Sequence, residues 1–240
     1  MRKYAKALGA LTLAAAAAIS PMHTAMAQPA DNLYQWPDLG TGVWLPDASA
    51  LFGGGPKMKV KPEIQAIMTE NRARLGGSGT CVPVGTVKMI RTGMPLKFFF
   101  SPDAVLIMSD MDDMMFRQVF MDGRDHPGSD DIIGSYFGHS VGHWEDGSLV
   151  IDTVGFIEDS ELPITPQTHV TERYTWLEPN HMRLVLRVED PGTLEEPFEN
   201  TIDYYGHPDW DLQEFYCIEA NNRSRPAADG TESVDLTPPE

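Results

Sequence analysis

Short apolar runs, broken at regular intervals by turn-forming residues, occupy most of the chain after Val82. The breaks are combinations of Gly, Pro, Asp and Asn, such as Asp146-Gly147, which favour tight reversals between strands. Runs of this length and spacing are typical of an antiparallel sheet that closes into a barrel or packs as a sandwich. The runs that we expect to be strands are 82–90, 96–100, 104–108, 116–121, 139–145, 149–154, 168–177, 182–188, 201–205 and 215–218.

One segment has a helical pattern instead. Residues 62–75 begin with Pro62, carry apolar side chains three or four positions apart, and are followed by Gly76-Gly77. Proline at the first helical position and glycine after the last are ordinary start and stop signals. The sequence therefore predicts an all-β fold, an antiparallel barrel with one N-terminal helix.

The first 27 residues have the features of an export signal. A basic start up to Lys6 precedes an apolar run from Leu8 to Ile19, and Thr24-Ala-Met-Ala27 follows with small residues at cleavage spacing. The run is short for a membrane span, so we expect a cleaved secretory signal, with an uncleaved anchor as the alternative. The mature protein would then begin at Gln28 and be exported.

The rest of the chain divides simply. Residues 28–221 are long enough for one large β-domain, and residues 222–240 are polar, acidic and rich in proline, which predicts a disordered tail. The 240-residue chain has a formal net charge of −17, which argues against nucleic acid and anionic membrane surfaces as partners. No stretch beyond the signal is long enough for membrane insertion.

The only two cysteines, Cys81 and Cys217, both lie in the expected mature region. In an oxidising compartment a single pair most simply forms one disulfide. A catalytic or metal-binding cysteine is the alternative, but neither residue has other ligand-type residues clustered around it.

Histidines supply the first candidates for chemistry. His139 and His143 alternate with Trp144 in a predicted strand, so both imidazoles project from the same face and Trp144 from the other. They could be metal ligands, an acid–base pair or an ordinary polar strand face. Residues four apart in a strand are separated by about 13 Å, too far to share one ion, so we predict no metal.

A second candidate is the turn that contains Arg124 and His126. The Asp122-Gly123 pair and Pro127 fix the turn, and a guanidinium there could bind a substrate carboxylate beside a titratable imidazole. The alternative is that an aspartate of the turn caps it and pairs with Arg124.

A third candidate is the run that begins at His169. In a strand, Glu172 shares a face with Val170 and Tyr174, whereas Arg173 shares the opposite face with His169. Because neighbours in a strand face opposite ways, only one of Glu172 and Arg173 can point into a barrel. A buried Arg173 beside His169 would suit a substrate carboxylate. The alternative is a solvated face with a cross-strand ion pair.

Known catalytic templates are absent from the sequence. It contains no G-x-S-x-G elbow, no Walker loop and no dinucleotide-binding glycine fingerprint, so we predict no organic cofactor. Aromatic and methionine residues are mostly expected in the core, although part of such a set commonly lines a barrel interior.

The order of several motifs resembles that of a known family. These motifs are Cys81-x-Pro83-x-Gly85, Phe120–Pro127, Gly138–Gly147, Leu149–Thr153, His169–Arg173, Glu189–Pro191 and Cys217–Asn222. They resemble a family of exported Gram-negative proteins, mostly without assigned function, that is expected to fold as a lipocalin-like (calycin-type) barrel. The resemblance covers residues 36–222 and implies a periplasmic location. The chain departs from the family pattern at Asp146-Gly147, where the order is usually Gly-Asp, and at His143, which is often Arg.

Some members of that family act on lignin-derived aromatic compounds, which suggests an enzyme. We expect an exported, cofactor-independent lyase, a decarboxylase or related carbon–carbon lyase or isomerase, for a small aromatic carboxylic acid. Its expected catalytic residues are His126, His139 and Glu172, and its expected substrate-binding residues are Arg124, Arg173, His143, Trp144, His169 and Tyr136. The alternative is a non-catalytic carrier of an apolar small molecule. Polar groups inside the barrel would favour the enzyme, and an apolar interior would favour the carrier.

Overall fold

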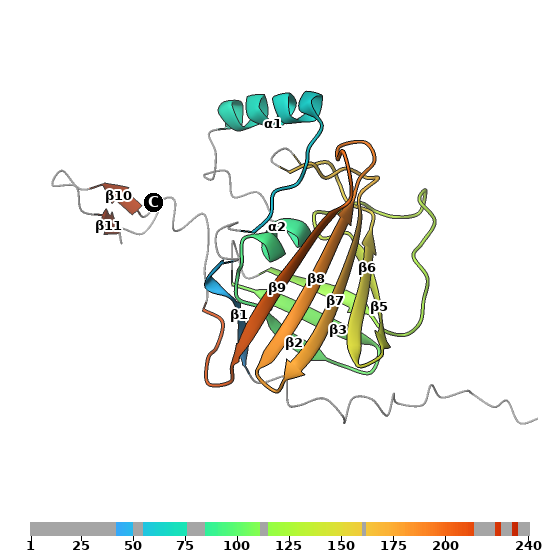
Figure 1. The fold of residues 1–240 in the computed structure, drawn as a ribbon, viewed down its shortest axis with the longest axis vertical. Helices are drawn as coiled ribbons and strands as arrows, with labels where there is room; N and C mark the ends of the chain where they lie inside the picture. Colours follow the sequence, from blue (N-terminus) through green and yellow to red (C-terminus); the bar gives the residue numbers. More distant parts are fainter. Residues whose placement is uncertain are drawn as a thin grey trace, which may run out of the picture.

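The computed structural model describes residues 42–49, 55–75, 85–110, 115–159, 162–213, 224–226 and 232–234. Nine strands in these ranges form a single curved sheet with the order β1-β9-β8-β7-β6-β5-β4-β3-β2 (Figure 1). The strands are β1 (Val43–Pro46), β2 (Lys97–Phe100), β3 (Ala104–Ser109), β4 (Met115–Phe120), β5 (His139–Glu145), β6 (Ser148–Val154), β7 (His169–Glu178), β8 (His181–Glu189) and β9 (Phe198–His207).

The two edges of this sheet meet and close the barrel. Trp44 of β1 and Leu96, the residue before β2, exchange backbone hydrogen bonds of 2.7 and 2.9 Å. The edges meet at this one bridge, so the sheet is a nearly closed barrel and the barrel prediction is confirmed.

The hairpin from β5 to β6 shows how a sequence signal becomes geometry. Asp146 and Gly147 both have positive φ angles, 47° and 76°, which is the conformation of a two-residue hairpin turn. This turn and the β7–β8 turn at residues 179–180 lie at the same end of the barrel, the lower end in Figure 1.

One pair of neighbouring strands departs from the antiparallel pattern. β4 and β5 run parallel, paired only through Val119 with Ser140 and Phe120 with Val141. Parallel neighbours need a connection that crosses from one end to the other, and residues 121–138 make it. The wholly antiparallel arrangement that we expected is therefore interrupted at this one pair.

The helix prediction is confirmed for α1 (Pro62–Leu75), but a second helix, α2 (Gly85–Arg91), replaces the strand predicted at 82–90. A short apolar run does not distinguish a strand from a buried helix. α2 is such a helix, because Val87, Met89 and Ile90 are all buried.

Further differences lie near the two ends of the chain. β1 falls in a stretch rich in Gly, Pro and Asp for which we predicted no strand. In the segment for which composition predicts disorder, β10 (Ser224–Pro226) pairs with β11 (Glu232–Val234) in a small separate sheet. The expected signal at 1–27, the expected strand at 215–218 and the Cys81–Cys217 bridge lie outside the described residues.

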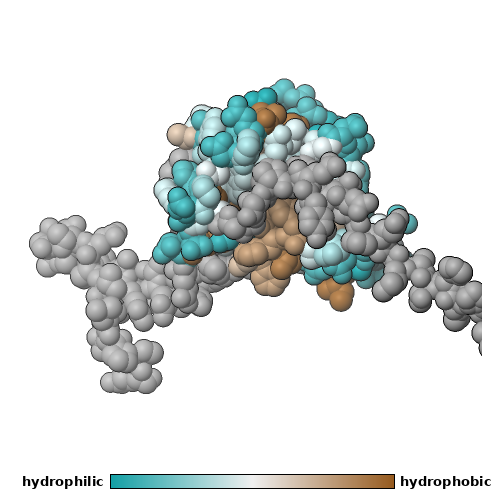
Figure 2. All heavy atoms as spheres, turned by 90° about the horizontal axis from the view of Figure 1, so that it is seen from below, coloured by the Kyte–Doolittle hydropathy of each residue, from teal (hydrophilic) through white to brown (hydrophobic). Residues whose placement is uncertain are grey.

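The core fills the barrel from its inner face. Alternate residues of each strand point inward, and those of β8, Met182, Leu184, Leu186 and Val188, are fully buried. Figure 2, which looks at the lower end, shows a patch of hydrophobic residues with hydrophilic residues on either side of it.

Candidate functional site

The candidate residues are divided between the two faces of the sheet. Glu172 and Trp144 point into the barrel, on the face that carries the core. His139, His143, His169 and Arg173 alternate with them and point outward. The structure therefore does not bring the expected catalytic carboxylate and the expected catalytic histidines to one place.

Inside the barrel, Glu172 is part of a buried polar group that we name the inner cluster: Arg117, Glu172, Tyr174, Tyr204 and Thr86. Arg117 donates to Glu172 Oε2 at 2.5 Å, and the Tyr174 hydroxyl donates to the same oxygen at 2.7 Å. Arg117 Nη1 also lies 3.4 Å from Thr86 Oγ1. Glu172, Tyr174 and Tyr204 are all 0% exposed, so these interactions take place away from bulk water.

Electrostatics within the inner cluster favour a charged arginine and neutral tyrosines. Burial tends to lower the pKa of Arg117, but the adjacent Glu172 carboxylate raises it above the ordinary value. Burial, reinforced by Glu172, raises the pKa of Tyr174 well above that of a free phenol, and that of Tyr204 in the same way. Both phenols therefore keep their protons at neutral pH and can donate hydrogen bonds.

Three buried polar atoms of the inner cluster have no hydrogen-bond partner within the described part of the chain. They are Arg117 Nε, Glu172 Oε1 and the Tyr204 hydroxyl. Buried polar groups in native proteins are nearly always satisfied, so such atoms point to an unseen partner.

Between the inner cluster and the lower end lie four inward-facing rings that we name the aromatic cluster: Phe98, Phe100, Trp144 and Trp176. Phe100 stacks on Trp144 with ring centroids 6.1 Å apart, and Trp144 lies 6.1 Å from Trp176. Phe98 meets Tyr174 edge to face at 5.4 Å, which joins the aromatic cluster to the inner cluster. Phe100, Trp144 and Trp176 are only partly buried, so the aromatic cluster reaches the surface of the molecule at this end.

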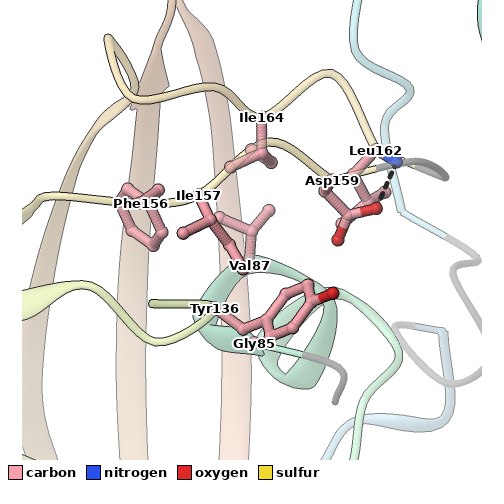
Figure 3. A pocket seen from close by; sticks show the side chains of 8 residues that line it. All are labelled: Gly85, Val87, Tyr136, Phe156, Ile157, Asp159, Leu162 and Ile164. Atoms are coloured by element: carbon pink, nitrogen blue, oxygen red, sulfur yellow. Dashed lines mark hydrogen bonds between the residues drawn. The ribbon is translucent and has the colours of Figure 1, made fainter. Parts of the chain in front are cut away.

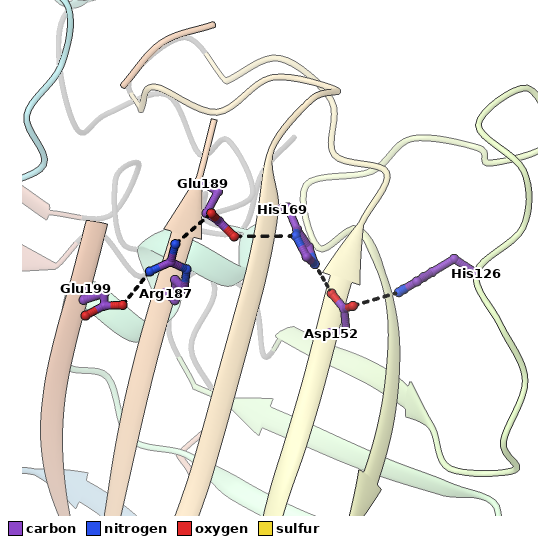
Figure 4. Close-up of polar contacts among 6 residues, drawn as sticks. All are labelled: His126, Asp152, His169, Arg187, Glu189 and Glu199. Atoms are coloured by element: carbon purple, nitrogen blue, oxygen red, sulfur yellow. Dashed lines mark hydrogen bonds and ion pairs between the residues drawn. The ribbon is translucent and has the colours of Figure 1, made fainter. Parts of the chain in front are cut away.

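On the outside, a chain of histidines and carboxylates crosses the upper ends of β5, β6, β7 and β8 and the loop that precedes β5. We name it the outer network: His126, His139, Asp152, His169 and Glu189. Figure 4 shows its part from His126 through Asp152 and His169 to Glu189. His126 Nδ1 and His139 Nδ1 are 2.8 Å apart, so one imidazole donates a hydrogen bond to the other. The sequence placed His126 and His139 in one acid–base function, and the structure does bring these two rings together.

Asp152 connects the other members of the outer network. Its carboxylate accepts a short hydrogen bond from His169 Nε2 and lies 4.0 Å from His126 Nε2. His169 Nδ1 is in turn 3.9 Å from Glu189, which pairs with Arg187. The network is continuous but partly exposed, on the convex face of the sheet.

The environment of His139 favours its neutral form. Burial, followed by the proximity of His126 and Arg124, lowers the pKa of His139 below the ordinary histidine value. The His139 ring also stacks on the Phe120 ring, with their centroids 5.2 Å apart. The guanidinium of Arg124 lies over the same Phe120 ring, 4.0 Å from its centroid.

Two arginines expected to bind substrate are already paired. Arg124 makes hydrogen bonds through Nε and Nη2 to the carboxylate of Asp122, as the capped-turn alternative predicted. Arg173 pairs with Glu145 across the outer face, as the ion-pair alternative predicted. His143 is exposed on the same face. None of these three residues contributes to the inner cluster.

Tyr136, the remaining candidate, lines a small pocket at the upper end of the barrel (Figure 3). The pocket encloses about 220 Å³ including its open mouth, and its lining residues include the apolar side chains of Val87, Phe156 and Ile164. Asp159 at its edge accepts a hydrogen bond from the Leu162 backbone. The pocket is too small and too open to hold an aromatic acid as it stands.

Sequence reasoning missed Arg117, Tyr174 and Tyr204 in the interior and Asp152 outside. In β4, Arg117 shares the inward face with Met115 and Val119. The alternation of side chains along the strand was therefore a signal that Arg117 points into the barrel. Tyr174 is two residues from Glu172 in β7, so strand alternation places its side chain on the same inward face.

No set of three or more His, Cys, Asp or Glu residues in the described ranges is placed to hold a metal ion. Among the described helices, none combines the length and the apolar character needed to cross a bilayer. The chain matches no family model and no curated protein. Functional inference therefore rests on the site itself.

Proposed function

We propose that this protein is a cofactor-independent lyase that binds a small aromatic carboxylic acid inside the barrel, with its ring against the aromatic cluster and a polar group at the inner cluster. The observation that carries the proposal is the buried Arg117–Glu172 pair, with the Tyr174 hydroxyl on the same carboxylate, at the inner end of an aromatic wall. Barrel mouths with apolar walls and a few convergent polar groups are common ligand sites.

Decarboxylation of an aromatic acid requires a place for the electron pair of the broken bond and a group that moves protons. In a decarboxylation the bond to the carboxylate breaks, CO2 leaves, and a proton replaces it on carbon. A conjugated phenolic ring can carry the electron pair in between. Glu172 would act as the base for the phenolic proton and return that proton at the end, while water would supply the proton that replaces CO2 on carbon. Arg117 would hold the orientation and charge of Glu172, and the aromatic cluster would orient the ring. A positioned acid–base group contributes about 10²–10⁴ in rate.

The outer network offers a second location for the same kind of chemistry. The 2.8 Å contact between His126 and His139, with Asp152 beyond, is an arrangement that can relay a proton. It lies on a convex, partly exposed surface, which provides little to enclose a substrate. We therefore assign catalysis to the interior.

A carrier is the competing function, and the aromatic cluster is the observation in its favour. Stacked and edge-to-face rings would suit an apolar aromatic cargo equally well. The buried Glu172 carboxylate, with its unpartnered oxygen, supports the enzyme, because an acid–base reaction needs such a group and an apolar cargo does not.

The test uses protein spanning residues 28–240 and a panel of aromatic acids: 4-hydroxycinnamate, 4-hydroxybenzoate, cinnamate and benzoate. We expect CO2 release from at least one of them without added metal or cofactor. Glu172→Gln should lower kcat by about 10²–10⁴. Glu178→Gln, an exposed carboxylate on the same strand, is the matched control and should leave kcat unchanged.

Three results would redirect the assignment. Full turnover by Glu172→Gln together with a large loss in His126→Ala or His139→Ala would move catalysis to the outer network. A ligand recovered unchanged from the purified protein, with no acid turned over, would establish the carrier. Turnover that depends on added zinc or iron would reject the cofactor-independent mechanism.

We further propose that the protein is exported to the periplasm after cleavage at residue 27, and that it is a relative of the Gram-negative barrel family named above. The basic and apolar pattern of residues 1–27 and the order of motifs from Trp36 to Asn222 support these two proposals.

A further inference from the structure

We infer that the inner cluster is a binding site for a neutral phenolic hydroxyl, so that a substrate enters the barrel hydroxyl first. This inference concerns the site of the proposed function and names the group that it recognises. The carboxylate of an aromatic acid would then remain toward the lower end, beside the aromatic cluster.

Each unpartnered atom of the inner cluster limits the kind of hydrogen bond that a ligand can make there. Arg117 Nε can only donate, Glu172 Oε1 can only accept as a carboxylate, and the Tyr204 hydroxyl can do either. A hydroxyl group donates one hydrogen bond and accepts two. One ligand hydroxyl can therefore donate to Glu172 while it accepts from Arg117 and Tyr204.

Other common polar groups fit less well. A carboxylate has no proton for Glu172 Oε1 and would place a second negative charge beside it. An ammonium group has no lone pair to accept from Arg117 Nε. The Arg117 and Glu172 charges already compensate each other at 2.5 Å, so the site favours a ligand group without net charge.

Aromatic rings lead from the lower end to the inner cluster. The inward positions of β7, counted from the lower end, are Trp176, Tyr174 and Glu172, so two aromatic side chains precede the carboxylate. Phe98 contacts both of these rings, at 5.4 Å from Tyr174 and 6.4 Å from Trp176. Aromatic walls that end at a hydroxyl-binding group match a phenol better than an aliphatic alcohol.

The test measures the binding of three probes of matched size: p-cresol, 4-methylanisole and p-toluate. Cresol has the hydroxyl, methylanisole replaces its proton by a methyl group, and toluate replaces the hydroxyl by a carboxylate. Binding is followed by quenching of tryptophan fluorescence and by calorimetry on protein spanning residues 28–240. We expect cresol to bind at least tenfold more tightly than either analogue, because each analogue leaves Glu172 Oε1 unpaired.

Neighbouring tyrosines provide a matched pair of variants. Tyr204 points inward and is fully buried, whereas Tyr205 points outward and is 42% exposed. Tyr204→Phe should weaken cresol binding about tenfold and leave methylanisole binding nearly unchanged. Tyr205→Phe should leave both unchanged. Circular dichroism and thermal unfolding of each variant verify the fold.

Equal affinity for cresol and methylanisole, or no effect of Tyr204→Phe, would overturn the inference. The same holds if the ligand-free protein contains only ordered water at the inner cluster and cresol does not displace it. Cresol also separates this inference from the proposed function. It has no carboxylate, so its binding is independent of lyase activity. Selective cresol binding without CO2 release from any acid would leave the inference standing and reject the lyase. Equal turnover of cinnamate and 4-hydroxycinnamate would reject the inference and leave the lyase standing.

Discussion

At the scale of single residues, Arg117 and Glu172 differ in burial from the ion pairs on the outer face of the barrel. Their side chains are 1% and 0% exposed, whereas Arg183 and Asp203 form a pair on the outer face at 44% and 26%. Removal of one partner from a buried pair leaves an uncompensated charge, which costs about 3–5 kcal/mol. An exposed pair contributes about 1 kcal/mol or less.

We therefore predict that Arg117→Met lowers the free energy of unfolding by about 3–5 kcal/mol, and Arg183→Met by at most about 1 kcal/mol. Urea denaturation followed by tryptophan fluorescence measures both. A loss for Arg117→Met no greater than that for Arg183→Met would mean that water enters the inner cluster freely.

Sequence reasoning at this scale could predict which face a residue occupies but not which partner it meets. Strand alternation correctly separated Glu172 from Arg173. It could not reveal that Arg117, 55 positions earlier, would meet Glu172, because that contact depends on the curvature and closure of the whole sheet. The His126–His139 contact was equally beyond alternation, since His126 lies in a loop.

At the scale of elements, α2 depends on one glycine. Gly85 has a φ of +65°, and its backbone lies against the carbonyl of Tyr136, to which Thr86 also donates a hydrogen bond of 3.3 Å. A Cβ atom at Gly85 would overlap that carbonyl oxygen, whereas one at Gly123, whose φ is +78°, would meet open space.

Gly85→Ala and Gly123→Ala thus separate backbone strain from steric overlap. We predict a loss of about 1–2 kcal/mol for Gly123→Ala, from the left-handed conformation alone. Gly85→Ala should lose about 2–5 kcal/mol, because overpacking adds to the strain. Thermal and urea unfolding measure the difference, and equal losses would show that the backbone at Tyr136 yields without cost.

The elements that sequence predicted best were those with both alternation and turn signals. β5 was predicted at its observed bounds, His139–Glu145, because an Asp-Gly turn follows it directly. α2 was mistaken for a strand because its apolar run is short and its helical burial arises only from contact with the barrel. β1 has only four residues, and its pairing with β9 comes from tertiary closure.

At the scale of the whole molecule, the expected export signal leads to a prediction about the two cysteines. We predict that protein spanning residues 28–240 contains a Cys81–Cys217 disulfide. A loop of more than about 100 residues would stabilise the fold by roughly 4 kcal/mol in the chain-entropy model. Alkylation followed by intact-mass measurement should detect two thiols only after reduction. Two thiols alkylated in the unreduced native protein would contradict the bridge.

The strand that closes the barrel also constrains the order in which the chain can assemble. The meander from β5 to β9 forms between sequence neighbours, but β1 must find β9 across nearly the whole domain and then reach Leu96. A contact between residues so far apart in sequence requires the chain between them to lose conformational entropy before the contact stabilises the fold. Such contacts therefore form slowly. We therefore expect the meander to form first and the docking of Val43–Pro46 to come late.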